Sequence, residues 1–292
     1  MSLVINHNLM AMNSARNLNS SYGKLSDSTR KLSSGLRVDT AADDAAGLAI
    51  RELMRSDIAA LNQGVRNAND GISLIQTADG ALGVIDEKLV RMKELAEQAA
   101  TGTYDSTQRL MIDSEYQQMA SEITRIANAT DFNGIKLLDG TLSGTHSGSG
   151  LKSTGALKIH FGTANDSAED YYYIKIGNAT ASSLGVGNAA SGDGSTISTQ
   201  ERAQKALEAL QNAIVSKDSI RAHLGAMQNR LENTISNLQI QAENLQAAES
   251  RISDVDVASE MTNFVKNQIL TQSAVAMLSQ ANSLPQLALN LL

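Results

Sequence analysis

The chain has 292 residues with no cysteine, no tryptophan and one proline, and its 24 basic and 31 acidic residues leave a net charge of −7. The absence of cysteine excludes disulfides and thiolate metal ligands, and the negative charge gives no general attraction to nucleic acid or anionic membranes. Hydrophobic residues make up 42% of the chain but aromatic residues only 3%, a composition that favours long aliphatic helix seams over a compact enzyme core.

The predicted helices, in chain order, cover residues 3–33, 45–99, 106–128, 199–252 and 256–284. A hinge at 34–42 joins the first two. Ten of the 21 glycines fall within 141–200, a Ser- and Thr-rich stretch that cannot be continuous helix. Inside it, residues 156–161 alternate and residues 171–176 are β-prone, so we expect one or two β-hairpins there.

Aliphatic residues spaced by multiples of seven predict a coiled-coil seam in each long helix. The seam residues are Leu61, Ile75, Leu82, Leu224, Leu231, Leu238 and Leu245. The simplest fold pairs the two long helices with each other and the two terminal helices with each other. We therefore expect a mainly α fold, in which long antiparallel coiled-coil helices come from both ends of the chain and a small central region forms β-hairpins.

Three sequence patterns mark predicted helix starts. Residues 198–201 (STQE) have the spacing of a capping box. Residues 40–43 (TAAD) and 253–256 (SDVD) are similar starts with acidic groups near the positive end of a helix. The adjacent pair Asp43 and Asp44 is interpreted as helix-start charge and not as an acid/base or cation site, because neighbouring helix residues do not face each other.

Both ends of the chain lack charge. Residues 1–15 contain no Lys or Arg, and residues 267–292 contain no charged side chain. The first stretch lacks the basic region and unbroken apolar run of a cleavable secretory signal, and the second is too polar to span a membrane. Because burying unpaired charge is expensive, neutral polar faces predict that both ends become buried in a multi-subunit assembly. The predicted assembly interface comprises Leu18, Leu25, Leu32, Met261, Phe264, Val275, Leu278 and Leu284.

Catalytic chemistry has little support in the sequence. The four histidines lie in four different segments, and no zinc-protease, nucleophile-elbow or phosphate-loop motif is present. We expect no catalytic residue, no metal and no cofactor. The triplet Tyr171–Tyr173 is interpreted as hairpin packing, with a stacking platform for nucleic acid or sugar as the weaker alternative. Candidate sites for O-linked sugars in the insert are Ser182, Ser183, Ser195 and Thr196.

Several long motifs resemble those of bacterial flagellins. They are LSSGLRVDTAADDAAGLAI (32–50), GISLIQTADGAL (71–82), FNGIKLLDG (132–140), AESRISDVDVASEM (248–261) and QANSLPQLALNLL (280–292). The resemblance covers about residues 1–140 and 200–292 and leaves the insert unmatched. Hook–filament junction proteins of the same superfamily are the near alternative. A soluble coiled-coil adaptor is a more distant one, because charged outer faces would be expected at its ends.

The resemblance implies a subunit of the flagellar filament, which serves motility. Such a subunit is exported unfolded and uncleaved through the type III apparatus, so its expected place is the extracellular filament after a cytoplasmic stage. The implied partners are further copies of the chain, an export chaperone, the export apparatus and a filament cap. Residues 1–42 and 253–292 would form the inner core of the filament, residues 43–140 and 200–252 the outer core, and residues 141–199 a variable insert.

The segment RMKELAEQ (91–98) resembles the one by which many flagellins engage Toll-like receptor 5 of vertebrates. That resemblance implies that Arg91, Leu95 and Glu115 are receptor contacts. The residues alone also allow a packing interpretation, in which Arg91 pairs with Glu115 across an antiparallel helix contact and Leu95 lies in a seam.

Overall fold

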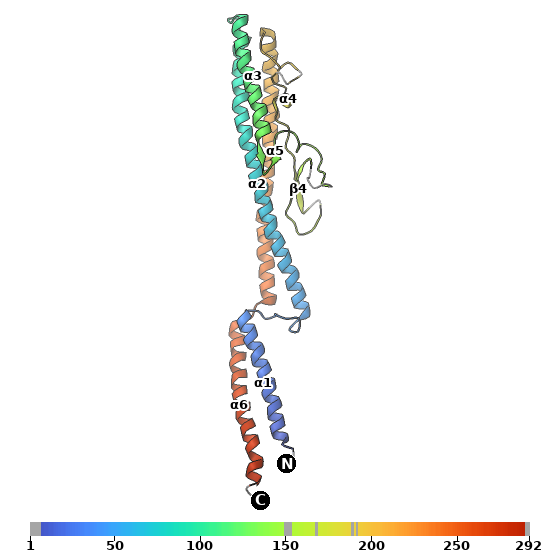
Figure 1. The fold of residues 1–292 in the computed structure, drawn as a ribbon, viewed down its shortest axis with the longest axis vertical. Coiled ribbons are helices and arrows are strands. Elements are labelled where there is room, and N and C mark those ends of the chain that lie inside the picture. Colours follow the sequence, from blue (N-terminus) through green and yellow to red (C-terminus); the bar gives the residue numbers. More distant parts are fainter. Residues whose placement is uncertain (1–6, 149–153, 167–168, 188–189, 191, 290–292) are drawn as a thin grey trace. The chain divides into compact units, whose positions relative to one another are not determined.

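The computed structural model describes residues 7–148, 154–166, 169–187, 190 and 192–289, without the side chains of 284–289. Its helices are α1 (Leu9–Ser34), α2 (Ala45–Ala100), α3 (Ser106–Ala129), α4 (Ala181–Leu184), α5 (Gln200–Ser253) and α6 (Val257–Leu289) (Figure 1). Its strands are β1 (Asp131–Phe132), β2 (Ile135–Lys136), β3 (Leu157–His160) and β4 (Tyr171–Ile174). The predicted mainly α fold with a small hairpin region is confirmed. In the described part of the chain, no helix is long and apolar enough to span a membrane.

The chain divides into two compact units. Unit 1 contains Met1–Ile58 and Glu243–Leu292, and unit 2 contains Ala59–Ala242. The boundaries therefore fall inside α2 and α5, whereas the sequence placed its divisions at the hinges, near residues 42 and 252. The division into inner core, outer core and insert describes an assembled state and stays a prediction.

In unit 1, α1 and α6 lie side by side over most of their length (Figure 1). Asn8 Nδ2 donates to the Ala281 carbonyl at 2.7 Å, which ties the start of α1 to the last turns of α6, so the two helices are antiparallel. Helix α1 begins at Leu9, later than the expected residue 3, because the Asn8 side chain accepts from Ala11 N and caps the helix. Residues 3–6 of the prediction lie outside the described residues.

In unit 2, α2, α3 and α5 enclose one aliphatic core. The seam residues buried in this unit are Leu61, Ile75, Leu82, Leu224, Leu231 and Leu238. The remaining seam residue, Leu245, belongs to unit 1 and is half-buried. Two ion pairs connect the long helices: Lys217 Nζ lies 2.6 Å from Asp86, and Arg221 donates to Asp79 at 2.7 Å.

Strands β3 and β4 lie in the two segments where the sequence predicts β structure, whereas the hairpin of β1 and β2 lies outside the insert and was not predicted. Strands β1 and β2 are joined by Asn133 and Gly134, both with positive φ, the conformation that a two-residue hairpin loop requires. Strands β3 and β4 pair antiparallel from Leu157 opposite Ile174 to His160 opposite Tyr171.

The insert rests on α2 at a glycine. A Cβ on Gly64 would overlap the carbonyl oxygen of Phe161, so only glycine admits this close approach. Nearby, Asn67 Nδ2 donates to the His160 carbonyl at 2.8 Å. From the other strand, Tyr172 packs against the Phe161 ring at a centroid distance of 4.6 Å. These contacts agree with the packing interpretation of the tyrosine triplet.

The capping residues differ from those expected. Helix α5 is capped by Thr199, whose Oγ1 accepts from Arg202 N, and not by Ser198. Helix α6 is capped by Asp256, which accepts from the N–H groups of residues 258 and 259, and not by Ser253. Helix α2 is capped by Asp44. In each case the expected side chain already has another partner: Thr196 for Ser198, Asp254 for Ser253 and Asp43 for Thr40.

Candidate functional site

The paired terminal helices carry many large hydrophobic side chains that face solvent. On α1 these are Leu9, Met10, Met12 and Tyr22. On α6 they are Val257, Met261, Val265, Ile269, Leu270, Val275 and Met277. The last charged residue of α6 is Lys266, and from 267 onward the side chains between these apolar residues are neutral. Exposed apolar surface of this extent marks an interaction surface.

The predicted assembly residues divide into two groups on this helix pair. Half-buried ones are Leu18, Leu25, Leu32, Phe264 and Leu278. Met261 and Val275 are exposed. The side chain of Leu284 lies outside the described residues. Because α1 and α6 pack on each other, the half-buried group is already partly covered within one chain, and contact with a second copy stays a prediction for all of them.

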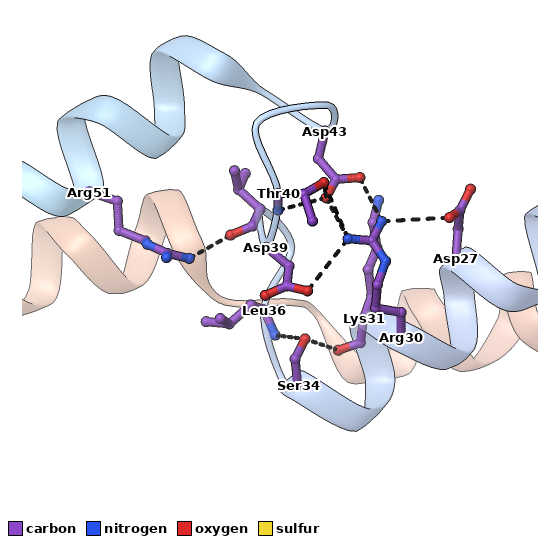
Figure 2. Close-up of polar contacts among 10 residues, drawn as sticks. Asp27, Arg30, Lys31, Ser34, Leu36, Asp39, Thr40, Asp43 and Arg51 are labelled. Atoms are coloured by element: carbon purple, nitrogen blue, oxygen red, sulfur yellow. Dashed lines mark hydrogen bonds and ion pairs between the residues drawn. The ribbon is translucent and has the colours of Figure 1, made fainter.

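A connector, defined here as residues 35–44, joins α1 to the first turns of α2 within unit 1 (Figure 2). Arg30 from α1 is its central cation. Its guanidinium donates to both carboxylate oxygens of Asp43 at 3.0 Å, and it lies 3.5 Å from Asp39 and 3.5 Å from Asp27. Asp43 also accepts from the N–H and the hydroxyl of Thr40 at 3.1 and 3.0 Å. One cation therefore holds three carboxylates at this corner.

The electrostatics of this cluster are dominated by the pairing of Arg30 with Asp43. The hydrogen bonds from Arg30 and then from Thr40 hold the pKa of Asp43 well below its usual range. The same pairing raises the pKa of Arg30. Asp43 therefore stays ionised in mild acid. The adjacent Asp44 caps α2, which agrees with its interpretation as helix-start charge. Asp43 does not cap the helix and instead binds Arg30.

On the other side of the connector, Arg51 projects from α2 and is buried. Its Nη1 donates to the Val38 carbonyl at 2.6 Å, and its Nη2 donates to Glu52 at 2.8 Å. Val38 is itself among the buried hydrophobic residues. The connector is thus fixed by an arginine from each of the helices that it joins.

A second connector, residues 254–256 between α5 and α6, pairs with the first. Leu36 and Asp254 form an antiparallel β-bridge, and Val255 N donates to the Gly35 carbonyl at 3.0 Å. Gly35 has a φ of 72°, a left-handed conformation that ends α1. The two points where the chain enters and leaves the terminal helix pair are therefore held together by backbone hydrogen bonds.

The predicted receptor contacts lie in unit 2. Arg91 on α2 donates to Glu115 on α3 at 2.8 Å, both side chains are exposed, and Glu115 and Glu94 raise the pKa of Arg91. Leu95 is only 2% exposed and belongs to the core. The structure thus contains the Arg91–Glu115 contact of the packing interpretation. The exposed groups available to a receptor are Arg91 and Glu115, and the receptor role stays a prediction.

The candidate sugar acceptors differ in accessibility. Ser182 and Ser183 lie exposed on the short helix α4. Ser195 and Thr196 are half-buried, and the Thr196 hydroxyl donates to Ser198 at 3.0 Å. Ser182 and Ser183 are therefore the more accessible pair. Modification of all four residues stays a prediction. No group of His, Asp or Glu able to hold a metal ion occurs among the residues that the structure describes.

Sequence reasoning missed the two arginines that hold the first connector, residues 35–44. Arg30 and Arg51 were ordinary charged residues in helical patterns, and nothing in their spacing indicated that both contact one connector. The available signal was the acid-rich stretch 39–44 between two arginine-bearing helices, which requires counter-charges when it is folded.

The fold and site together define a class: a mainly helical protein whose paired terminal helices carry unpartnered apolar side chains.

Comparison with known families narrows this class. The bacterial flagellin N-terminal helical region matches residues 5–143, and the bacterial flagellin C-terminal helical region matches residues 207–292. The chain belongs to the bacterial flagellin family.

Similar proteins match along the whole chain. Flagellin FlaB2 of Treponema pallidum is 43% identical over 290 residues, 99% of this chain and 100% of its own length. A flagellin of Halalkalibacterium halodurans is also 43% identical, with the same coverage of both chains. The flagellar filament 33 kDa core protein of Treponema phagedenis is a third such relative, at 43% over 290 residues.

Two solved structures are similar to parts of the chain. A flagellar hook-associated protein from Vibrio parahaemolyticus superposes with a TM-score of 0.56 at 14% identity and covers 73% of this chain and all of its own. This likeness shows the fold alone. Bacillus cereus flagellin is 32% identical, with a TM-score of 0.47, and covers 63% of this chain and 94% of its own. The identity of the full-length relatives favours a flagellin over the hook–filament junction alternative.

Proposed function

We propose that this protein is a structural, non-enzymatic subunit that self-assembles into the helical filament of the bacterial flagellum and thereby serves motility. The observation that carries the proposal is the helix pair α1 and α6. It exposes large apolar side chains on both helices and has no charge on α6 beyond Lys266. Relatives that match the whole chain are named as flagellins and as a filament core protein, which supports the same role.

The physical argument is burial by repetition. Burying one exposed Val, Leu, Ile or Met side chain is worth about 1.5–3 kcal/mol. Neutral Asn, Gln, Ser and Thr between them can enter an interface at lower cost than charges can. A contact that joins different faces of identical subunits and does not close into a ring builds an open helical polymer. Many such subunits are needed to surround the exposed faces of every helix pair.

Seeded polymerisation of the purified chain tests the proposal. Heat-dissociated protein is cooled with short filament fragments and viewed by negative-stain microscopy, and long uniform tubes are expected. The variant Val275→Asp places a charge on an exposed apolar position of α6, 49% exposed, so it should keep its helix content yet fail to elongate seeds. Ser182→Asp, on the exposed surface of the insert, is the matched control and should elongate like the parent. Failure of the parent to form tubes over a range of salt and protein concentration would refute self-assembly.

The export partners follow as part of the same proposal. A chain with no cysteine has no disulfide to reduce before it is unfolded, which suits passage through a narrow secretion channel. The partners proposed are a chaperone, the type III export apparatus and a filament cap, and the proposed location is the extracellular filament. In a cell whose export apparatus is inactivated, the chain should accumulate in the cytoplasm and be missing from the medium.

We infer a second role as a ligand of vertebrate Toll-like receptor 5, and one contact supports it. The pair Arg91 and Glu115 forms an exposed charged patch across α2 and α3. Arg91→Ala together with Glu115→Ala should lower the potency of the soluble chain on receptor-bearing reporter cells at least tenfold. Arg125→Ala, which removes another exposed arginine paired on α3, should leave the potency unchanged. Equal potency of all three proteins would reject the receptor role.

A further inference from the structure

Two connectors, residues 35–44 and 254–256, attach the terminal helices α1 and α6 to the rest of unit 1. We propose that they form a two-sided latch: the two connectors become ordered together, and together they hold α1 and α6 in place. Each connector makes backbone hydrogen bonds to the other in addition to its local contacts.

The first connector depends on charge at its α1 side. Asp43 receives both guanidinium hydrogen bonds of Arg30, while Asp39 and Asp27 lie at the edge of the same guanidinium. Without Arg30 these carboxylates would repel one another. The turn from Thr40 to Asp43 adds only the backbone bond from Asp43 N to the Thr40 carbonyl, at 3.0 Å, and the bonds from Thr40 to the Asp43 carboxylate. The pairing with Arg30 is therefore the main contact that fixes this turn.

The α2 side depends on a buried cation. The Arg51 guanidinium needs hydrogen-bond acceptors because a buried charge without partners is costly. The Val38 carbonyl supplies one, but within the described residues Arg51 Nε has no partner. If the connector left its place, the guanidinium would lose this acceptor as well. Arg51 thus stabilises the ordered connector, which supplies one of its two hydrogen-bond acceptors, while Glu52 on α2 supplies the other.

Arg37 transmits this order to the second connector. Its backbone N–H donates to the Ser253 carbonyl at 2.6 Å, and its Nη2 donates to the Ile252 carbonyl at 2.7 Å. These carbonyls lie at the end of α5, where the helix itself offers no donors. The β-bridge of Leu36 with Asp254 continues the contact. The end of α5 and the start of the path to α6 are therefore ordered by the connector that follows α1.

The consequence is all-or-none attachment. A change that loosens the Arg30–Asp43 contact must also loosen residues 252–257, although the hydrogen bonds of Asp43 go to Arg30 and Thr40. Conversely, loss of the Arg37 guanidinium must loosen the turn at residues 40–43. Coupling in both directions distinguishes a latch from two independent local turns.

Hydrogen exchange read by mass spectrometry on the full chain tests the coupling. The peptides of interest cover residues 35–44 and 252–257, measured in solution and in any polymer that sediments, with each variant compared with the parent in the same state. Asp43→Asn should speed exchange at least tenfold in both peptides. Arg37→Gln should do the same from the other side. Asp27→Asn removes a longer, more exposed contact of the same arginine and should change both peptides less than twofold.

Three outcomes would overturn the proposal. The first is that Asp43→Asn speeds the 35–44 peptide but leaves 252–257 at the parent rate, which would show independent turns. The second is that Asp43→Asn and Asp27→Asn have the same effect. The third is that the parent exchanges both peptides at the rate of an unstructured chain in every state. Circular dichroism at 222 nm checks that each variant retains its helices.

Discussion

The ion pair between Lys217 on α5 and Asp86 on α2 is asymmetric in a way that mutation can expose. The Lys217 side chain is 2% exposed, and its ammonium lies 2.6 Å from both Asp86 and Asp218. The two carboxylates are 37% and 60% exposed. The cation has therefore lost its water, whereas both anions keep part of theirs. Removing one member of the pair should cost far more than removing the other.

Asp86→Asn leaves the buried ammonium with Asp218 alone. Breaking a buried ion pair from one side costs about 3–5 kcal/mol, and the remaining carboxylate reduces the expected loss to about 2 kcal/mol. Lys217→Met removes the buried charge itself and replaces it with an apolar side chain of similar length. The carboxylates that remain are reached by water, so the free energy of unfolding should stay within about 1 kcal/mol of the parent value.

Thermal and urea unfolding followed by circular dichroism measure the difference. A domain of this size shifts its Tm by about 2–4 °C per kcal/mol, so Asp86→Asn should lower Tm by about 4–8 °C. The control is Asp79→Asn, because Asp79 and its partner Arg221 are both substantially exposed, and this change should cost at most about 1 kcal/mol. If Lys217→Met destabilises unit 2 more than Asp86→Asn does, the reasoning from unequal hydration is wrong.

Three further predictions follow from single contacts. The pKa of the Asp43 carboxyl is lower in the folded chain than in the unfolded chain. The stability that Asp43 contributes is therefore complete above the unfolded pKa of about 4 and is lost as pH falls toward the folded pKa. In Arg30→Gln, an NMR titration should show the pKa of Asp43 rising toward 3.8. Gly64→Ala should destabilise unit 2 by about 1–2 kcal/mol, whereas Gly83→Ala, with open space around it, should stabilise it by about 0.5–1 kcal/mol in urea unfolding. Tyr116→Phe should cost about 1–3 kcal/mol by the same assay, because it removes the buried hydroxyl that donates to the Gly194 carbonyl at 2.7 Å.

Each of these has a clear contrary result. An Asp43 midpoint that does not move when Arg30 is replaced would mean that the arginine does not hold the carboxylate. Equal effects of alanine at both helix glycines would mean that the insert does not approach α2 as closely as described. An unchanged stability of the tyrosine variant would indicate that water replaces its hydroxyl.

The sequence by itself determined the helices and their pairing. Aliphatic residues repeated every seven positions have only one way to be buried, which is along a partner of equal length. This predicted the pair α2 and α5, and the symmetric order of short and long helices along the chain predicted a second pair, α1 and α6. The hairpin at Asn133 and Gly134 was not predicted, although an Asn-Gly pair is the sequence that a two-residue hairpin turn favours. The motifs that resemble flagellins indicated the family, which the comparisons confirmed.

Tertiary structure alone decided which polar groups meet. Arg30, Arg51 and Lys217 look alike in sequence, yet one clamps a connector, one is buried under it and one is buried between long helices. The caps moved by one to a few residues for the same reason, since Thr40 and Asp43 were already used in a turn. Periodicity reports which face of a helix is apolar, because burial depends on the local pattern. It does not report which charges become neighbours, because that depends on contacts between residues far apart in the chain.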